Sequence, residues 1–196
     1  MPTVNALKGQ RIGLLGGSFN PAHEGHLHIS KLALDRLGLD AVWWMVSPQN
    51  PLKSTDDMAG FSERMGQAAQ VAADDHRIIV TGIERELGTR FTVDTVQALK
   101  RRFPRVRFVL VMGADLLAEV PKWKNWCGLF NAVPIAVFAR PSYSYQALSG
   151  KAARRFGTKR VSRSRWSTLV NMRPPAWAFL RTKEHSQSAT RIRAGR

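Results

Sequence analysis

Short, nearly continuous apolar runs recur at wide spacing and constrain the fold more than any other feature of this chain. Such runs are typical of strands buried on both faces of a parallel sheet. Helical patterns occupy the intervals, at residues 24–37, 61–73 and 92–103, with Gly38 as a stop for the first and Thr92 as a candidate cap for the third. The alternation predicts an α/β fold with a doubly wound parallel sheet. The runs are RIGLLGG (11–17), AVWWMVSP (41–48), HRIIVTGI (76–83), VRFVLVMG (106–113), AVPIAVFARP (132–141) and PPAWAFLRTK (174–183).

The size of the chain favours one domain. With 196 residues, 44% of them hydrophobic, it can bury a sizeable core. No internal repeat, low-complexity segment or clean boundary divides the sequence. We therefore expect a single domain over residues 1–196 that includes the segment 151–196. Residues 49–60 and 142–168 are predicted to be loops, the second with a short helix around 144–156.

No sign of secretion or membrane insertion is visible. The first residues lack a basic stretch followed by a long apolar core, and no apolar run approaches the roughly 18 residues that span a bilayer. The single cysteine, Cys127, excludes an internal disulfide and a multi-cysteine metal site. We expect a cytoplasmic protein with no membrane partner.

The formal net charge of +16 favours anionic partners such as nucleotides, nucleic acid or an acidic membrane surface. The charge is unevenly placed, because residues 151–196 hold 13 Lys and Arg against one acid, Glu184. An RNA-binding face and a solvated surface that attracts a polyphosphate both fit this pattern. Charge alone does not decide between them.

Three of the five histidines stand together in LLGGSFNPAHEGHLHIS (14–30), directly after the first apolar run. Gly16 and Gly17 predict a turn between the strand and a helix, where backbone amides and the helix N-terminus attract an anion. His23 and His26 are three residues apart and would lie side by side on the first helical turn. Imidazoles at that place can donate hydrogen bonds to phosphate oxygens. The same residues also fit an ordinary packed turn, and a metal site is less well supported because no Cys/His cluster follows.

Two motifs far apart in the chain connect it with a known superfamily. The segment GGSFNPAHEGH (16–26) resembles the signature G-[ST]-F-[DN]-P-x-H-x-G-H of the HxGH-motif nucleotidyltransferases, which transfer a nucleotidyl group and release pyrophosphate. Near the C-terminus, SATRIR (188–193) resembles their second signature, [ST]-x-T-x-[IL]-R. Ser188 or Thr190 can cap a helix whose amides face phosphate, and Arg193 offers a bidentate fork. The resemblance implies a Rossmann-like sheet.

Three segments between these motifs resemble the nicotinate-nucleotide adenylyltransferases in particular. They are GIERELGTRFTVDTVQAL (82–99), FVLVMGADLLAEVPKWKNW (108–126) and VFARPSY (137–143). The resemblance implies adenylyl transfer from ATP to nicotinate mononucleotide, which yields deamido-NAD and pyrophosphate in NAD biosynthesis. Mg²⁺ is expected to enter with ATP and to be held mainly by substrate and water.

The resemblance also implies a role for individual residues of this chain. The expected catalytic set is His23, His26, Lys53 and Arg193. The expected ATP site comprises Gly16, Gly17, Ser18, Phe19, Gly113, Asp115, Ser188, Thr190 and Arg193. The expected acceptor site comprises Thr92 through its backbone, Trp123 stacked on the pyridine ring, and Lys124.

Two positions depart from the family pattern. In the segment NPLK (50–53), Leu52 replaces the histidine of the family's P-P-H-[KR] loop, while Lys53 is retained. Lys124 stands where the family often has a tyrosine after the stacking tryptophan. A lysine there favours an acidic ligand over an amide.

Other functions stay open at the level of sequence. An adenylyltransferase could act instead on nicotinamide mononucleotide or phosphopantetheine, although short phosphopantetheine enzymes lack the G-x-D…W pattern seen here. A protein that binds RNA through residues 151–196 is a second alternative. No aromatic RNA-binding motif is recognisable, so nucleic acid is not the expected partner. A homo-oligomer is compatible with the sequence, which leaves the oligomeric state open.

Overall fold

The computed structural model describes residues 7–48, 58–140 and 143–181. Within these ranges a seven-stranded sheet has the order β3-β2-β1-β4-β5-β7-β6, and all neighbouring strands are parallel. Because the chain returns to the middle of the sheet between β3 and β4, the sheet is doubly wound, as predicted. The strands are β1 (Arg11–Gly17), β2 (Ala41–Val46), β3 (Ile78–Thr81), β4 (Arg107–Gly113), β5 (Ile135–Phe138), β6 (Arg160–Val161) and β7 (Trp177–Leu180).

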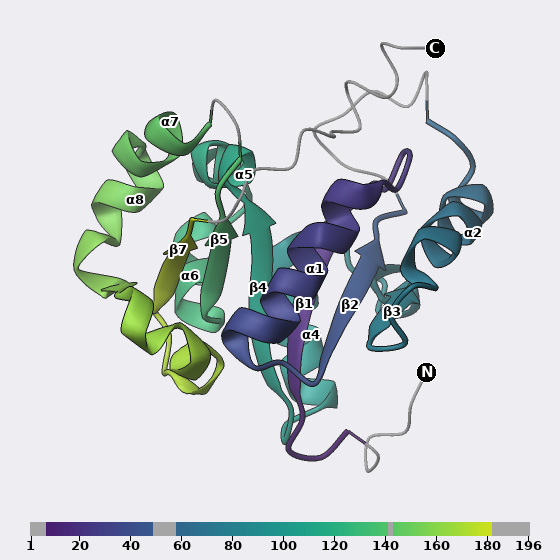
Figure 1. Cartoon of the computed structure of the whole chain (residues 1–196), viewed down its shortest axis with the longest axis horizontal. Helices are drawn as coiled ribbons and strands as arrows, with labels where there is room; N and C mark the ends of the chain where they lie inside the picture. Colours follow the sequence, from purple (N-terminus) through teal and green to yellow (C-terminus); the bar gives the residue numbers. More distant parts are fainter. Residues whose placement is uncertain (1–6, 49–57, 141–142, 182–196) are drawn as a thin grey trace.

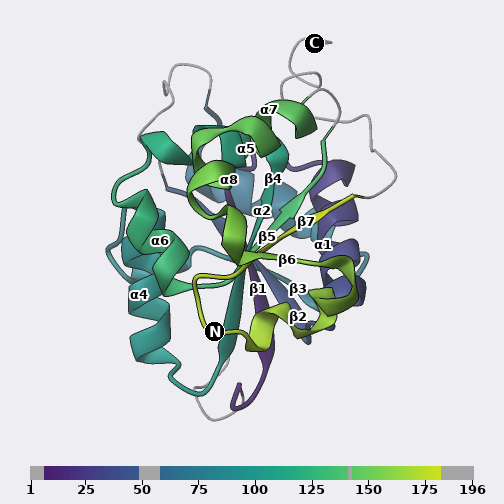
Figure 2. The same ribbon diagram turned by 90° about the vertical axis from the view of Figure 1, so that its left-hand side faces the viewer.

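Helices cover both faces of this sheet (Figure 1; Figure 2). One face carries α1 (Glu24–Leu37), α2 (Phe61–Ala72) and the 3-10 helix η3 (Arg163–Asn171). The opposite face carries α4 (Thr92–Arg102), α5 (Ala114–Glu119), α6 (Trp126–Ala132), α7 (Ser144–Ser149) and α8 (Lys151–Arg155). Shorter turns lie in the connections, namely α3 (Ile83–Glu86), η1 (Val120–Lys122) and η2 (Gly157–Lys159). No helix of these described ranges is long and apolar enough to cross a membrane.

Successive residues of each strand enter different cores, because side chains alternate between the two faces of a strand. In β2, Trp43 and Met45 join the core beneath α4 and α6. Val42, Trp44 and Val46 join the core beneath α1 and α2. All six residues of β2 are buried. This two-sided burial explains why the strands are continuous apolar runs in the sequence.

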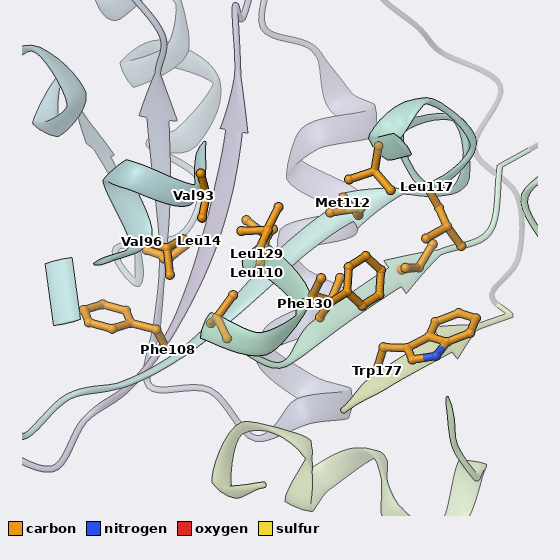
Figure 3. Close-up of a cluster of buried hydrophobic side chains, with 14 of the residues drawn as sticks. Leu14, Val93, Val96, Phe108, Leu110, Met112, Leu117, Leu129, Phe130 and Trp177 are labelled. Atoms are coloured by element: carbon orange, nitrogen blue, oxygen red, sulfur yellow. The ribbon is translucent and has the colours of Figure 1, made fainter. Parts of the chain in front are cut away.

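The core beneath α4 and α6 is the larger of the two hydrophobic clusters (Figure 3). Leu14 and Leu110 come from neighbouring strands of the sheet, and Val96 and Leu129 reach them from the two helices. Full burial of such a side chain contributes about 1.5–3 kcal/mol. This packing fixes the start of α4 against the sheet.

The predicted helices and loops can be compared with the structure. The three helical patterns are α1, α2 and α4, each within one residue of the predicted ends, and Gly38 closes α1 with a left-handed φ of 60°. The prediction that Thr92 caps α4 is wrong, because the N-cap is Phe91 and makes no side-chain cap bond. The short helix predicted around 144–156 is confirmed and is divided into α7 and α8. The loop predicted for the rest of 142–168 is wrong where the structure describes it, because that part holds η2, β6 and the start of η3. These elements are too short to show a full period in the sequence.

Candidate active site

The loop that follows β1 begins at Ser18 and not at the glycine pair. Gly16 and Gly17 are the last residues of β1, paired with β2, so the prediction that they form the turn is wrong. The left-handed residue of this loop is Phe19, with φ of 47°. That conformation costs an L-residue about 1–2 kcal/mol. Burial offsets the cost, because the Phe19 ring is 2% exposed and stacks on Trp44 with centroids 5.1 Å apart.

His23 and His26 cap the start of α1 reciprocally. His23 is the N-cap, and its Nδ1 accepts a hydrogen bond from the Gly25 amide at 3.0 Å. The His23 amide donates in turn to Nδ1 of His26 at 3.3 Å, and the two ring centroids lie 3.9 Å apart. Since each Nδ1 is an acceptor, a neutral ring carries its proton on Nε2. In each neutral ring, Nε2–H is therefore the hydrogen-bond donor, while Nδ1 serves the cap.

The environment of His26 keeps its ring neutral. Burial first, and then the charges of His23 and Arg140, lower the pKa of His26 well below the usual 6.5. A neutral imidazole with its Nδ1 occupied cannot serve as a base at that atom. It can donate a hydrogen bond from Nε2 to an oxygen that gains negative charge.

A buried hydrogen-bond chain holds the first turn of α1 against the sheet. Nε1 of Trp44 donates to Oγ of Ser30 at 2.7 Å, and Ser30 Oγ donates to the carbonyl of His26 at 2.8 Å. Phe19 packs against both ends of this chain, with its ring centroid 4.7 Å from that of His26 and 5.1 Å from that of Trp44. The position of His26 is therefore set by packing from β2.

The residues that follow β4 and β5 form an ion pair at the same edge of the sheet, which is the upper edge in Figure 1. Nη1 of Arg140 lies 3.0 Å from Oδ2 of Asp115. A Cβ at Gly113 would collide with Asp115 Oδ1 and lie 3.0 Å from Arg140 Nε, so a side chain there would displace this ion pair. Asp115 Oδ1 is buried and, within the described residues, has no hydrogen-bond partner. Because buried acceptors are normally paired, this oxygen is open to a ligand donor.

Arg140 is a site residue that the sequence analysis did not identify. Its guanidinium is hydrogen-bonded to Asp115, and its charge helps to lower the pKa of His26. The available signal was its position, directly after the buried run of β5 within VFARPSY. Ligands of doubly wound sheets bind beyond the carboxyl ends of strands.

A pocket of about 100 Å³, open to solvent, lies between the start of α4 and the η1–α6 connection. The three residues predicted for the acceptor, Thr92, Trp123 and Lys124, all line it. Lys124 Nζ lies 3.0 Å from Oδ2 of Asp94 and 4.7 Å from the centroid of the Phe91 ring. The complete lining is Arg90, Phe91, Thr92, Val93, Lys122, Trp123, Lys124 and Leu129. Three cations thus surround an aromatic pocket, which suits a flat anionic ligand.

Four predicted site residues lie outside the described residues. They are Lys53, Ser188, Thr190 and Arg193. Their expected roles stay predictions, as does the effect of Leu52 in the same loop as Lys53.

Comparison with known proteins accords with this geometry. A family model described as cytidylyltransferase-like matches residues 14–195. A probable nicotinate-nucleotide adenylyltransferase from Parvibaculum lavamentivorans is 51% identical over 185 residues, which are 94% of this chain and 92% of that relative. The chain belongs to the nicotinate-nucleotide adenylyltransferase branch of the cytidylyltransferase-like family. The resemblance seen in the motifs is confirmed.

Further similarities to this adenylyltransferase come from sequence and from structure. A relative with the same name from Rhizobium johnstonii is 44% identical over 188 residues, 96% of this chain and 94% of its own length. The solved structure of Plasmodium falciparum nicotinic acid mononucleotide adenylyltransferase complexed with NaAD superposes with a TM-score of 0.71. It covers 94% of this chain and 83% of its own, at 15% identity, and therefore shows a shared fold.

Proposed function

We propose that the enzyme transfers the adenylyl group of ATP to nicotinate mononucleotide and releases pyrophosphate, as a step of NAD biosynthesis. The observation that carries the proposal is the arrangement of two half-sites at one edge of the sheet. The first half-site holds the histidine pair and Arg140, and the second is the aromatic pocket with three cations. The names of the relatives from Parvibaculum and Rhizobium support the same reaction.

The reaction that fits these groups is an in-line displacement. An oxygen of the acceptor's 5′-phosphate attacks the α-phosphorus of ATP, the bond from that phosphorus to the bridging oxygen breaks, and pyrophosphate leaves with the bond electrons. Nucleophile and leaving group are both anionic, so positioning and charge stabilisation carry most of the rate. His23 and His26 would donate from Nε2 to phosphate oxygens. The neutral state of His26 suits that task.

The remaining nucleotide contacts are proposed from the motifs and the loop geometry. Lys53 and Arg193 would neutralise the leaving phosphates, and Ser188 and Thr190 would donate hydroxyl or amide hydrogen bonds. Gly16, Gly17, Ser18 and Phe19 would form the backbone wall of the ATP site, and Gly113 and Asp115 would face the ribose. The unpaired Oδ1 of Asp115 is an acceptor suited to a sugar hydroxyl.

A divalent metal ion accompanies ATP in nucleotidyltransferases of this family, and we propose Mg²⁺. Within the described ranges, no three His, Cys, Asp or Glu side chains are grouped as a ligand set. Asp115 is the carboxylate at the site, and one of its oxygens is already paired with Arg140. The residues therefore fit an ion carried mainly by phosphate oxygens and water, whose charge would offset that of the triphosphate.

The acceptor pocket would distinguish the acid from the amide. Trp123 offers an electron-rich face to the electron-poor pyridine ring. The backbone N–H groups at the amino end of α4, near Thr92, and the ammonium of Lys124 favour a negative substituent on that ring. Nicotinamide carries no such charge, so these groups give it less stabilisation.

The decisive experiment measures pyrophosphate release from ATP with three acceptors in parallel. Nicotinate mononucleotide should give the highest kcat/KM, with nicotinamide mononucleotide and phosphopantetheine far below it. Equal or higher kcat/KM with either alternative would contradict the assignment of the substrate. Salt-sensitive RNA binding without measurable turnover would instead favour the basic segment 151–196 as an RNA-binding face.

We place this reaction in the cytoplasm. A single free cysteine, Cys127, is typical of a reducing compartment. Both proposed substrates are phosphorylated and would be attracted by the net charge of +16.

A further inference from the structure

Arg64, near the start of α2, is a buried cation that the reaction scheme does not use. Arg64 is only 1% exposed to solvent. Nη1 donates to the carbonyls of Ser18 at 2.6 Å and Ser47 at 2.8 Å, Nη2 donates to that of Pro48 at 3.0 Å, and Nε donates to that of Ala59 at 2.9 Å. One guanidinium thus joins the loop after β1 to the loop after β2 and to the residues before α2.

The chemistry of this position is specific to arginine. A buried charge is unfavourable unless hydrogen bonds compensate for lost hydration. Arg64 uses four of its five N–H groups on carbonyl oxygens that point in different directions. Lysine has three donors on one nitrogen and cannot reproduce this planar fork. An apolar side chain would leave the same carbonyls without these donors.

Ser47 connects this cluster to the acceptor side of the site. Its amide donates to the carbonyl of Gly17 at 2.9 Å, at the end of β1. Its side chain is hydrogen-bonded to the buried carboxyl of Glu84, which is also hydrogen-bonded to Thr95. Thr95 Oγ1 lies 3.2 Å from the carbonyl of Phe91, a wall of the acceptor pocket. Ser47 therefore makes hydrogen bonds toward both half-sites.

We propose that Arg64 and Glu84 are positioning residues, which hold the ATP loop and the acceptor pocket at the relative placement that transfer requires. The inference rests on the proposed function. In-line attack needs the reacting atoms about 3–3.5 Å apart, and a displacement of about 1 Å can lower the rate about 100-fold. The two half-sites are built on different loops at this edge of the sheet. Their relative placement therefore depends on contacts that join those loops. The hydrogen bonds from Ser18 through Arg64, Ser47, Glu84 and Thr95 are those contacts.

The test compares Arg64→Lys, Glu84→Ala and the double variant in steady-state kinetics. Each single variant should lower kcat about 10- to 100-fold, while the KM for each substrate changes less than about threefold, because each half-site keeps its own binding groups. The fold-loss in kcat of the double variant should be smaller than the product of the two single fold-losses, because both changes disrupt the same set of contacts around Ser47. Glu84→Gln, which keeps a hydrogen-bonding side chain, should recover most of the kcat lost in Glu84→Ala.

A matched control separates positioning from loss of stability. Phe103→Leu removes buried volume beside Trp43 and Phe108, near the amino end of β4 and away from the loops. Its melting temperature should fall without a fall in kcat. If Arg64→Lys loses no more kcat than Phe103→Leu at equal loss of melting temperature, the inference is wrong. Multiplicative losses in the double variant would also overturn it.

The same assays keep this inference apart from the assignment of the substrate. All variants are measured with whichever acceptor the wild-type enzyme turns over best. Absence of wild-type turnover with nicotinate mononucleotide would refute the proposed function and leave the comparison among variants valid. Unchanged kcat in Arg64→Lys with an active wild type would refute only the positioning role.

Discussion

His23 and His26 form a reciprocal cap at the start of α1, in which the amide of His23 donates to Nδ1 of His26 at 3.3 Å. The same arrangement places the Nε2–H group of each ring away from the helix backbone. Helix capping uses Nδ1 of each ring, whereas the proposed phosphate recognition would use Nε2. Each function can therefore be tested separately.

Replacement of His26 by alanine should reduce turnover far more than ATP binding. A hydrogen-bond donor that acts on developing charge typically contributes 100- to 1000-fold in kcat, so His26→Ala should lower kcat by about that factor while the KM for ATP stays within a few-fold. His28→Ala, on the same helix, is the control and should leave both constants close to wild type. Equal losses in kcat and in ATP affinity would contradict a role in the transition state.

Replacement of His23 should separate the cap from the catalytic contact. Asparagine is a good N-cap and alanine is a poor one. His23→Ala should lose about 1 kcal/mol and about 2–4 °C in melting temperature, whereas His23→Asn should melt close to wild type. Both variants lack Nε2–H and should show low kcat. Wild-type kcat in His23→Asn would mean that His23 serves the helix alone.

Lys124 should contribute to the preference for the acidic acceptor. Its ammonium is half-exposed and paired with Asp94, so its effect is that of a screened charge. Lys124→Gln should lower the ratio of kcat/KM for nicotinate over nicotinamide mononucleotide about two- to fivefold. Lys159→Gln, an exposed change on the far side of β7, tests for a general effect of net charge and should leave the ratio unchanged. An unchanged ratio in Lys124→Gln would assign the discrimination to backbone groups.

Glu84 should make stability depend on pH in a defined direction. Burial raises the pKa of its carboxyl from 4.5 to about 7, against smaller opposing effects of hydrogen bonds from Ser47 and Thr95. Between those values the folded state keeps a proton that the unfolded chain has lost, so stability falls as pH rises from about 4.5 to 7 and stays lower above it. The full effect is about 3 kcal/mol.

The measurement is the free energy of unfolding of wild type and Glu84→Gln at pH 5 and pH 8. Since glutamine does not titrate, Glu84→Gln should gain stability relative to wild type on going from pH 5 to pH 8. Glu119→Gln, at an exposed carboxylate, should show no such change. A constant difference between wild type and Glu84→Gln across this range would show that Glu84 titrates near its ordinary value.

The extent to which the sequence predicts the site differs between local and distant contacts. The strands, α1 with its stop at Gly38, and the neighbouring histidines all follow from residues close in the chain. The acceptor residues Thr92 and Trp123 were predicted through the family resemblance, and the structure brings them into one pocket. The turn predicted at the glycine pair was wrong because a tertiary contact determines the loop conformation. Phe19 takes the left-handed conformation there, and its ring stacks on Trp44.

The amino-acid pattern alone determined the parallel sheet, the presence of a loop and helix after β1 and the pairing of two imidazoles, because each depends on residues a few positions apart. Tertiary structure alone decided which charged groups act together. Arg64 is 46 residues from Ser18, and Asp115 is 25 residues from Arg140. Such groups become partners only when the carboxyl ends of parallel strands meet at one edge of the sheet. A guanidinium or carboxyl buried there needs hydrogen bonds, and only the fold determines which polar groups lie close enough to make them.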